Sequence, residues 1–184
     1  MKFIKTKIPD LYIIEPAVFG DDRGNFFESF NRKKFEKNIY PINFVQDNES
    51  ASSKGVLRGL HFQKPPYNQA KLVRCLSGRV LDIAVDIRKG SPTYGKHLAI
   101  ELSGENKRQL FVPRGFAHGF SVLSETAVFA YKVDNDYAPA HDAGLRWDDP
   151  VLAIDWGLVA REVLLAEKDK VLPFFADLDS PFNY

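Results

Sequence analysis

The chain has 184 residues, of which 45% are hydrophobic and 27% charged, and its formal net charge is +1. These values predict a single globular domain over residues 1–184, and they favour neither nucleic acid nor a membrane as a partner. No stretch approaches the roughly 20 apolar residues of a membrane span, and the N-terminus lacks the apolar run of a signal peptide. The only cysteine, Cys75, cannot form an intrachain disulfide. We therefore expect a reducing, cytoplasmic location with Cys75 in the core.

Alternating apolar and polar residues dominate the chain and predict many short β-strands. In chain order, strands are expected at residues 11–18, 43–46, 55–63, 71–76, 79–88, 97–102, 109–112 and 127–133. Glycine-containing turns at 20–24, 77–78, 90–92 and 103–104 separate several of them. Only two short helices are expected, at 31–38 with Asn31 as its cap and at 161–168. This all-β pattern with few helices predicts a sandwich or barrel.

The segment 55–63 places Arg58 and His61 inside an apolar strand. The two residues have opposite parity, so a regular strand would direct them to opposite faces. A bulge at Gly59 would bring both to the same side. A neutral imidazole is a competent general base when a carboxylate orients its other nitrogen. Asp169, Asp82 and Asp86 all remain candidates for that carboxylate.

Further polar groups lie in apolar runs. His118 and Tyr131 each have an ordinary alternative role, as a core histidine and a barrel-wall tyrosine. Next to a base, however, a tyrosine can protonate the opposite face of a substrate. Local cations suit phosphate oxygens, and nearby aromatic rings could stack on a base. The cations are Arg23, Arg58, Lys71 and Arg74, and the aromatic residues are Phe19, Phe26, Phe27 and Tyr137.

Metal binding is the main chemical alternative. Metal sites in small barrels usually combine clustered histidines with a carboxylate. His61 and His118 do not form a His-x-His pair, and no third ligand has a suggestive spacing. The remaining histidines, His97 and His141, are expected to be exposed. We therefore expect no metal and no other cofactor.

Together these motifs resemble the dTDP-4-dehydrorhamnose 3,5-epimerase family, the cupin-type epimerases of deoxysugar nucleotide synthesis. The resemblance extends nearly end to end, over residues 22–28, 44–48, 55–63, 71–74, 85–88, 91–95, 113–120, 131–132, 147–150, 154–156 and 167–169. It implies a cupin-type double-stranded β-helix, that is, a jelly-roll barrel with a few short helices. It also implies a homodimer that works without metal.

The resemblance further implies a reaction. Carbons 3 and 5 of dTDP-4-dehydro-6-deoxy-D-glucose would be inverted to give dTDP-4-dehydro-L-rhamnose, in the route to dTDP-L-rhamnose and surface polysaccharides such as lipopolysaccharide O-antigen. His61 matches the base and Asp169 its partner. Lys71 matches the cation that stabilises the enolate oxygen, and Tyr131 matches the acid on the far side.

The resemblance also assigns substrate contacts. The residues that match nucleotide and pyrophosphate contacts are Arg23, Glu28, Gln46, Asn48 and Arg58. His118 matches a residue near the phosphates, and the residues around the thymidine are Phe19, Phe26 and Tyr137. Asp142 and Lys168 are expected at the substrate. Three residues depart from the family pattern. Glu49 replaces a usual histidine, Asp136 replaces the first tyrosine of a common pair, and Asp142 lies where a glutamate is expected. The last two bear on how the sugar is placed.

Three alternatives remain open from the sequence. The first is a relative that inverts only carbon 3 or only carbon 5, and Tyr131 favours the double epimerase over it. The second is a metal-dependent cupin oxygenase or isomerase. The third is a non-catalytic nucleotide-sugar binding module, which would need neither a base nor an opposed acid.

Overall fold

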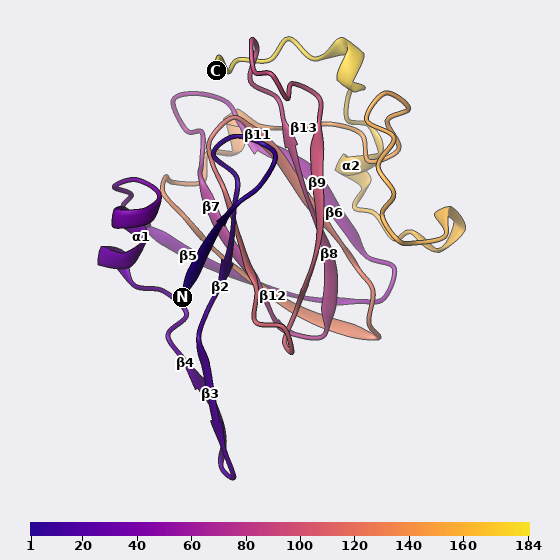
Figure 1. Ribbon diagram of the computed structural model, residues 1–184. Helices are drawn as coiled ribbons and strands as arrows, with labels where there is room; N and C mark the ends of the chain where they lie inside the picture. Colours follow the sequence, from indigo (N-terminus) through magenta and orange to yellow (C-terminus); the bar gives the residue numbers. More distant parts are fainter.

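The computed structural model describes residues 1–184 and confirms the all-β prediction, with two sheets facing each other (Figure 1). The first sheet contains, in spatial order, β1 (Lys2–Lys5), β2 (Tyr12–Glu15), β10 (Gln109–Val112), β7 (Lys71–Ser77), β12 (Thr126–Val133) and β5 (Gln46–Ser53). The second contains β13 (Asp142–Gly144), β6 (Leu57–Gln63), β11 (Phe116–Val122), β8 (Arg79–Asp86) and β9 (His97–Ser103). All pairings between these strands are antiparallel.

The main hydrophobic core lies between the two sheets. Strand β8 shows how it forms, because Val80 and Ala84 face this core whereas Ile83 and Val85 belong to a second core. Across the interior, Phe129 of β12 stacks on Phe120 of β11 at 4.2 Å between ring centroids. Burial of each such side chain contributes about 1.5–3 kcal/mol. Both faces of β8 are therefore buried, and the alternation in its sequence separates two cores rather than core from solvent.

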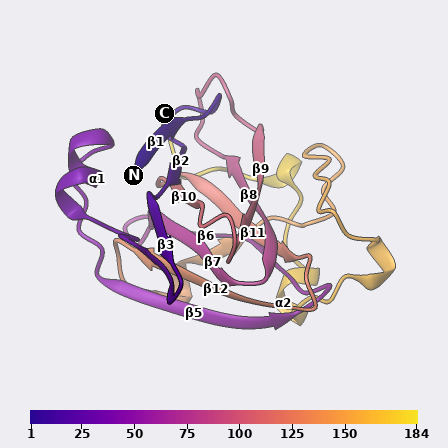
Figure 2. The ribbon, with the colours of Figure 1, turned by 60° about the horizontal axis from the view of Figure 1, so that its bottom comes forward.

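The outer faces of the sheets are covered by different parts of the chain. Helix α1 (Arg32–Asn38) packs Phe35 against Ile14, Leu72 and Phe111 of the first sheet. The chain after β13 covers the second sheet (Figure 2). The other short helices are η1 (Pro139–His141), η2 (Ala160–Glu162), α2 (Glu167–Lys170) and η3 (Phe175–Asp177). No helix is both long and apolar enough to cross a membrane.

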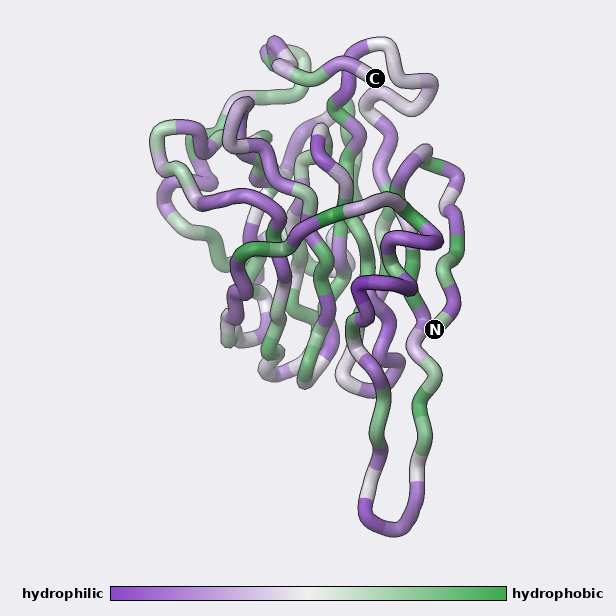
Figure 3. Tube along the Cα trace, turned by 90° about the vertical axis from the view of Figure 1, so that its left-hand side faces the viewer, coloured by the Kyte–Doolittle hydropathy of each residue, from purple (hydrophilic) through white to green (hydrophobic).

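Strands β3 (Val18–Asp21) and β4 (Gly24–Phe27) form a hairpin that projects away from the two sheets (Figures 1 and 3). Its tip is hydrophilic, as the hydropathy colouring in Figure 3 shows. Two aromatic side chains on its legs face solvent, with Phe19 66% and Phe26 73% exposed. Large apolar side chains exposed together on a projecting element are typical of a surface that binds a partner.

Most predicted elements are confirmed. The strands expected at 71–76, 79–88, 97–102, 109–112 and 127–133 are β7, β8, β9, β10 and β12, and that expected at 55–63 is β6. The turn at 20–24 closes the projecting hairpin. The side chain of Asn31 accepts a hydrogen bond from the backbone N–H of Lys34, so Asn31 caps α1 as predicted. Cys75 is buried, as expected.

Three predicted boundaries are wrong. The strand expected at 11–18 is interrupted at Pro16, which has no backbone N–H to donate. The strand expected at 43–46 begins only at Gln46 and extends to Ser53, over a polar stretch with little apolar alternation. The helix expected at 161–168 is replaced by η2, an extended segment and α2. In that segment Leu164 exchanges backbone hydrogen bonds with Gly55 and Leu57, so tertiary pairing overrides helix propensity.

Candidate active site

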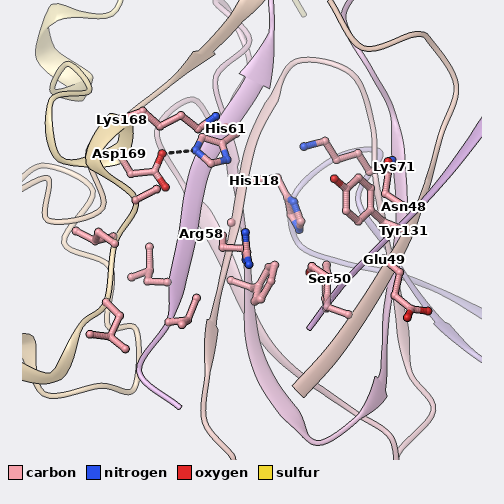
Figure 4. Close-up of a pocket in the computed structure, with 18 residues that line it drawn as sticks. Asn48, Glu49, Ser50, Arg58, His61, Lys71, His118, Tyr131, Lys168 and Asp169 are labelled. Atoms are coloured by element: carbon pink, nitrogen blue, oxygen red, sulfur yellow. Dashed lines mark hydrogen bonds and ion pairs between the residues drawn. The ribbon is translucent and has the colours of Figure 1, made fainter. Parts of the chain in front are cut away.

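A cavity of about 590 Å³ opens between the sheets and is bordered by β5, β6, β7, β11, β12 and α2 (Figure 4). Its polar lining combines imidazole, ammonium, guanidinium and phenol groups with one buried carboxylate. The lining includes Asn48, Glu49, Ser50, Arg58, His61, Lys71, His118, Tyr131, Lys168 and Asp169. The sequence therefore predicted most of the polar groups that this cavity brings together.

His61 and Asp169 form a close pair at one side of the cavity. His61 Nε2 lies 2.6 Å from Asp169 Oδ1, and the Asp169 side chain is only 2% exposed. The ring of His61 lies between Asp169 and the cavity (Figure 4). Because Nε2 is bonded to the carboxylate, Nδ1 is the nitrogen left to exchange a proton with a ligand. Of the three candidate carboxylates, only Asp169 partners His61.

The bulge predicted at Gly59 is confirmed. Along β11, His118 lies opposite His61 and Phe120 lies opposite Arg58, so β6 has one more residue than β11 between these pairs. Gly59 has φ +123°, and a Cβ added there would lie 2.6 Å from the Cα of Gly119. The extra residue allows Arg58 and His61 to line the same cavity despite their opposite parity.

A second histidine–aspartate pair lies deeper. His118 Nε2 is 3.0 and 3.1 Å from the two carboxylate oxygens of Asp82, and both side chains are buried. Lys71 lines the same part of the cavity and has no ion pair or hydrogen bond from its side chain. Burial lowers the pKa of Lys71 to about 8, while the negative charge of Asp82 partly opposes this shift. An unpaired ammonium in a cavity is suited to stabilise a developing oxyanion.

Tyr131 comes from β12, on the wall across from His61. Its hydroxyl is directed into the cavity (Figure 4). Burial raises the pKa of Tyr131, and the nearby positive charge of Arg58 opposes that shift. The phenol is therefore protonated at neutral pH and available as a proton donor. A group able to accept a proton and a group able to donate one thus lie on different walls of one cavity.

Other polar groups are held by neighbours. Arg58 donates from Nε and Nη2 to Ser52 Oγ, both at 3.2 Å. Lys168 Nζ lies 2.8 Å from Asp142 Oδ2, which raises the pKa of Lys168. Gln46 donates to the Asn48 side chain at 2.7 Å. Ser50 Oγ, in contrast, is a buried polar atom without a partner.

Several residues that the sequence predicted as substrate contacts do not line the cavity of their own chain. Arg23, Phe19 and Phe26 lie on the projecting hairpin, and Arg23 pairs with Asp21. Glu28 bonds to Asn31 and Lys34 beside α1. None of these four residues lines the cavity that contains His61, Lys71 and Tyr131.

Further residues lie at the margin or outside. Tyr137 is 55% exposed and Arg74 lies against Phe27 on another surface. The carboxylate of Glu49 is turned away from the cavity (Figure 4). Asp136 contributes a backbone carbonyl that accepts a hydrogen bond from Gln63. The prediction that His97 and His141 are exposed is wrong, because both are half-buried.

Two roles were missed from the sequence. Asp82 was considered as a partner of His61 but bonds to His118, and Ser52 was not considered although it holds Arg58. The alternation along β8 does indicate that Asp82 faces the interior, because Asp82 and Ala84 lie on the same face of the strand. No group of three or more histidine, cysteine, aspartate or glutamate side chains is arranged to hold a metal ion.

Comparison with known proteins shows to which family the chain belongs. The family described as dTDP-4-dehydrorhamnose 3,5-epimerase matches residues 5–177. The chain belongs to this family. A Shigella flexneri dTDP-4-dehydrorhamnose 3,5-epimerase is 54% identical over 180 residues, which cover 97% of this chain and 98% of the relative. The family resemblance predicted from the sequence is therefore confirmed, and with it the assignment of an epimerase, an isomerase-class enzyme.

Solved structures agree with the epimerase family and with its cupin-type fold. The crystal structure of the Elizabethkingia anophelis dTDP-4-dehydrorhamnose 3,5-epimerase is 55% identical, with a TM-score of 0.92 over 96% of this chain and 97% of that one. A Legionella pneumophila dTDP-6-deoxy-D-glucose-3,5-epimerase, in complex with dTDP-4-keto-L-rhamnose, is 49% identical, with a TM-score of 0.95 over 100% and 98%. A more distant neighbour, a 3'-monoepimerase from Streptomyces bikiniensis in complex with dTDP-quinovose, is 30% identical, with a TM-score of 0.88 over 94% and 87%.

Proposed function

We propose that the protein inverts carbons 3 and 5 of dTDP-4-dehydro-6-deoxy-D-glucose to give dTDP-4-dehydro-L-rhamnose, in dTDP-L-rhamnose biosynthesis. The observation that carries this proposal is that the His61–Asp169 pair and the Tyr131 hydroxyl lie on different walls of one cavity. The Lys71 ammonium lies near the Tyr131 hydroxyl in the same cavity. Inversion requires that a proton leave one face of a carbon and return to the other. Two proton-transfer groups on different walls meet that requirement.

The proposed step starts at a carbon next to the carbon 4 ketone. His61 Nδ1 accepts the proton, and the electrons of the broken C–H bond form a carbon–carbon double bond while the carbonyl oxygen becomes an enolate oxygen. Lys71 stabilises that charge, an effect of about 10²–10³ in rate for one donor in comparable sites. Tyr131 then donates its proton to the opposite face of the same carbon, and the ketone forms again. Exchange with solvent returns both side chains to their starting protonation states.

The nucleotide part of the substrate requires cations and hydrogen-bond groups at the mouth of the cavity. We assign this role to Arg58, Gln46 and Asn48, with Lys168 and Asp142 at the sugar and His118 deeper in the cavity, on the phosphate side. Support comes from their positions on or beside the cavity lining and from the ligand in the Legionella structure, a dTDP-linked 4-keto sugar. No cofactor enters this mechanism.

The separation of the hairpin from the cavity supports a homodimer. We assign Arg23, Phe19 and Phe26 of each protomer to the mouth of its partner's cavity, where a guanidinium would contact phosphate and the rings would contact thymidine. Glu28 would lie at the base of that contact. Tyr137, more than half exposed in a single chain, would complete the same surface. We assign the protein to the cytoplasm on its reduced, buried Cys75, with the product used for surface polysaccharides such as O-antigen.

Inversion at carbon 3 alone is the second candidate, favoured by the likeness to the Streptomyces bikiniensis 3'-monoepimerase. Proton NMR of the substrate with the enzyme in deuterated water, followed by stereospecific reduction, separates the two. Deuterium at carbons 3 and 5 with formation of dTDP-L-rhamnose supports the double epimerase. Deuterium and inversion at carbon 3 alone would establish the second candidate, and no exchange at either carbon would contradict both.

A further inference from the structure

The side chain of Ser52 connects the two sheets at the edge of the cavity. Strand β5, in the first sheet, alternates between half-buried and exposed side chains along its length. Ser52 is one of the half-buried residues, and it lies opposite Ala127, which belongs to the interior core. The chain then crosses to the second sheet, where Arg58 is near the start of β6. Ser52 Oγ accepts two hydrogen bonds from Arg58, from Nε and Nη2, both at 3.2 Å.

This geometry restricts an otherwise mobile side chain. Arg58 is exposed and has no ion pair with a carboxylate, so the hydroxyl of Ser52 is the only side-chain acceptor that fixes its guanidinium. A free arginine side chain loses conformational entropy when it is ordered by a ligand. The hydrogen bonds to Ser52 already restrict the Arg58 side chain, which reduces that loss. Moreover, two of the five N–H donors of the guanidinium are used by Ser52, which leaves three for an anion.

We propose that Ser52 is a positioning residue that orients the Arg58 guanidinium for the diphosphate of the nucleotide sugar. The inference rests on the proposed function, because it assumes that Arg58 contacts the diphosphate. A neutral hydroxyl is suited to this role, since it orients the guanidinium without neutralising it. A carboxylate at the same position would compete with the phosphate for the charge. The orientation also holds the Arg58 charge near the Tyr131 hydroxyl.

The neighbouring Ser53 provides a matched control. It is the next residue on the same strand, it is exposed, and its hydroxyl makes no hydrogen bond. Calorimetric titration with dTDP compares the wild type with Ser52→Ala, Ser52→Thr and Ser53→Ala. Ser52→Ala is expected to weaken dTDP binding about three- to tenfold, the value of one such hydrogen bond. Ser52→Thr, which keeps the hydroxyl, and Ser53→Ala are expected to bind as the wild type does. In steady-state kinetics, Ser52→Ala is expected to raise KM more than it lowers kcat.

A double-mutant cycle with Arg58→Ala separates this inference from the proposed function. If Ser52 acts through Arg58, Ser52→Ala produces no further loss of dTDP affinity in the Arg58→Ala background. The inference is overturned if the two losses add, or if Ser52→Ala alone binds dTDP with wild-type affinity. Wild-type dTDP affinity in Arg58→Ala would instead overturn the assignment of Arg58 in the proposed function. Circular dichroism and thermal unfolding establish that each variant is folded before it is titrated.

Discussion

His61 and His118 lie directly opposite each other on the adjacent strands β6 and β11, and each imidazole bonds to a different aspartate. They differ in access to the cavity. The side chain of His61 is 26% exposed, whereas that of His118 is 7% exposed and bonds to a fully buried carboxylate. His61 therefore combines an orienting carboxylate with a nitrogen that a ligand can reach, which is what a general base requires.

We expect His61→Ala to abolish deuterium exchange at both carbons 3 and 5. General acid–base groups contribute about 10²–10⁴ in rate, and the loss here is expected at or above the upper end because one base serves both carbons. Binding of dTDP is expected to persist, because the imidazole acts at the sugar. His97→Ala, on β9 and outside the cavity lining, is the matched control. Normal exchange in His61→Ala, followed by NMR in deuterated water, would show that another group is the base.

Tyr131→Phe is expected to separate exchange from inversion. The variant keeps the ring that packs in the barrel but loses the hydroxyl directed into the cavity. His61 would still remove and return protons, so deuterium incorporation continues while net inversion at both carbons is lost. Tyr67→Phe, whose ring lies against His141, is the control. Full double epimerisation by Tyr131→Phe, measured by coupled reduction, would assign the acid to a different group.

The lowered pKa of Lys71 predicts how kcat/KM depends on pH. Because burial lowers its pKa to about 8, the ammonium is lost as pH rises through that value, and kcat/KM is expected to fall about tenfold per pH unit above it. The folded-state pKa lies below the ordinary value of 10.5. At Lys71 the unfolded chain therefore binds more protons than the folded protein between about pH 8 and 10.5. The contribution of this group to the free energy of unfolding increases as pH rises through that range. Loss of activity above pH 8 would thus not reflect loss of the fold through Lys71.

Asp82 provides the test of that assignment. Its charge raises the pKa of Lys71 against the effect of burial. Asp82→Asn is therefore expected to move the alkaline limb of the pH–rate profile below pH 8. Lys71→Met is expected to lower kcat about 10²–10³-fold and to remove the limb. An unchanged limb in Lys71→Met would mean that a different group titrates there.

Gly59 is expected to tolerate no side chain. Alanine there would combine a positive φ with a contact of 2.6 Å to the Cα of Gly119. We expect Gly59→Ala to lower the free energy of unfolding by about 2–4 kcal/mol and to displace both Arg58 and His61 from the cavity. Gly20→Ala, whose added Cβ would meet its nearest atom at 3.6 Å, is the matched control. Denaturant unfolding measures both, and equal stability of the two variants would contradict the close approach of β6 and β11.

The sequence predicts local features well and long-range partners poorly. Strand β8, the cap at Asn31 and the bulge at Gly59 follow from alternation, side-chain chemistry and glycine placement, which are local signals. The partner of His61 does not. Asp169 is 108 residues away, and nothing local distinguishes it from Asp82 or Asp86. Family resemblance selected Asp169, and the geometry explains the choice, because Asp82 lies on the interior face of β8 beside His118 and Asp86 bonds to Arg88.

The same limit applies between chains. Resemblance predicted Arg23, Phe19 and Phe26 as substrate contacts, but within one chain they lie on a hairpin outside the cavity. If a partner protomer supplies them, two inactive variants should complement each other. We expect Arg23→Ala to raise KM and His61→Ala to abolish activity. A mixture of the two, unfolded and refolded together, would contain dimers in which one site has both wild-type residues, because Arg23 and His61 of that site come from different chains.

Equal mixing would place about half of the protein in mixed dimers if association is random. Each mixed dimer has one site with both residues and one with neither, so about a quarter of all sites would recover wild-type KM. If Arg23 and His61 served the same chain's site, the mixture would show only the KM of Arg23→Ala. Light scattering provides the second measurement, and a monomer at the enzyme concentrations used for activity would contradict the homodimer. Arg108→Ala, which removes a surface cation paired with Glu15, controls for the loss of a surface charge. This variant alone is expected to keep the wild-type KM.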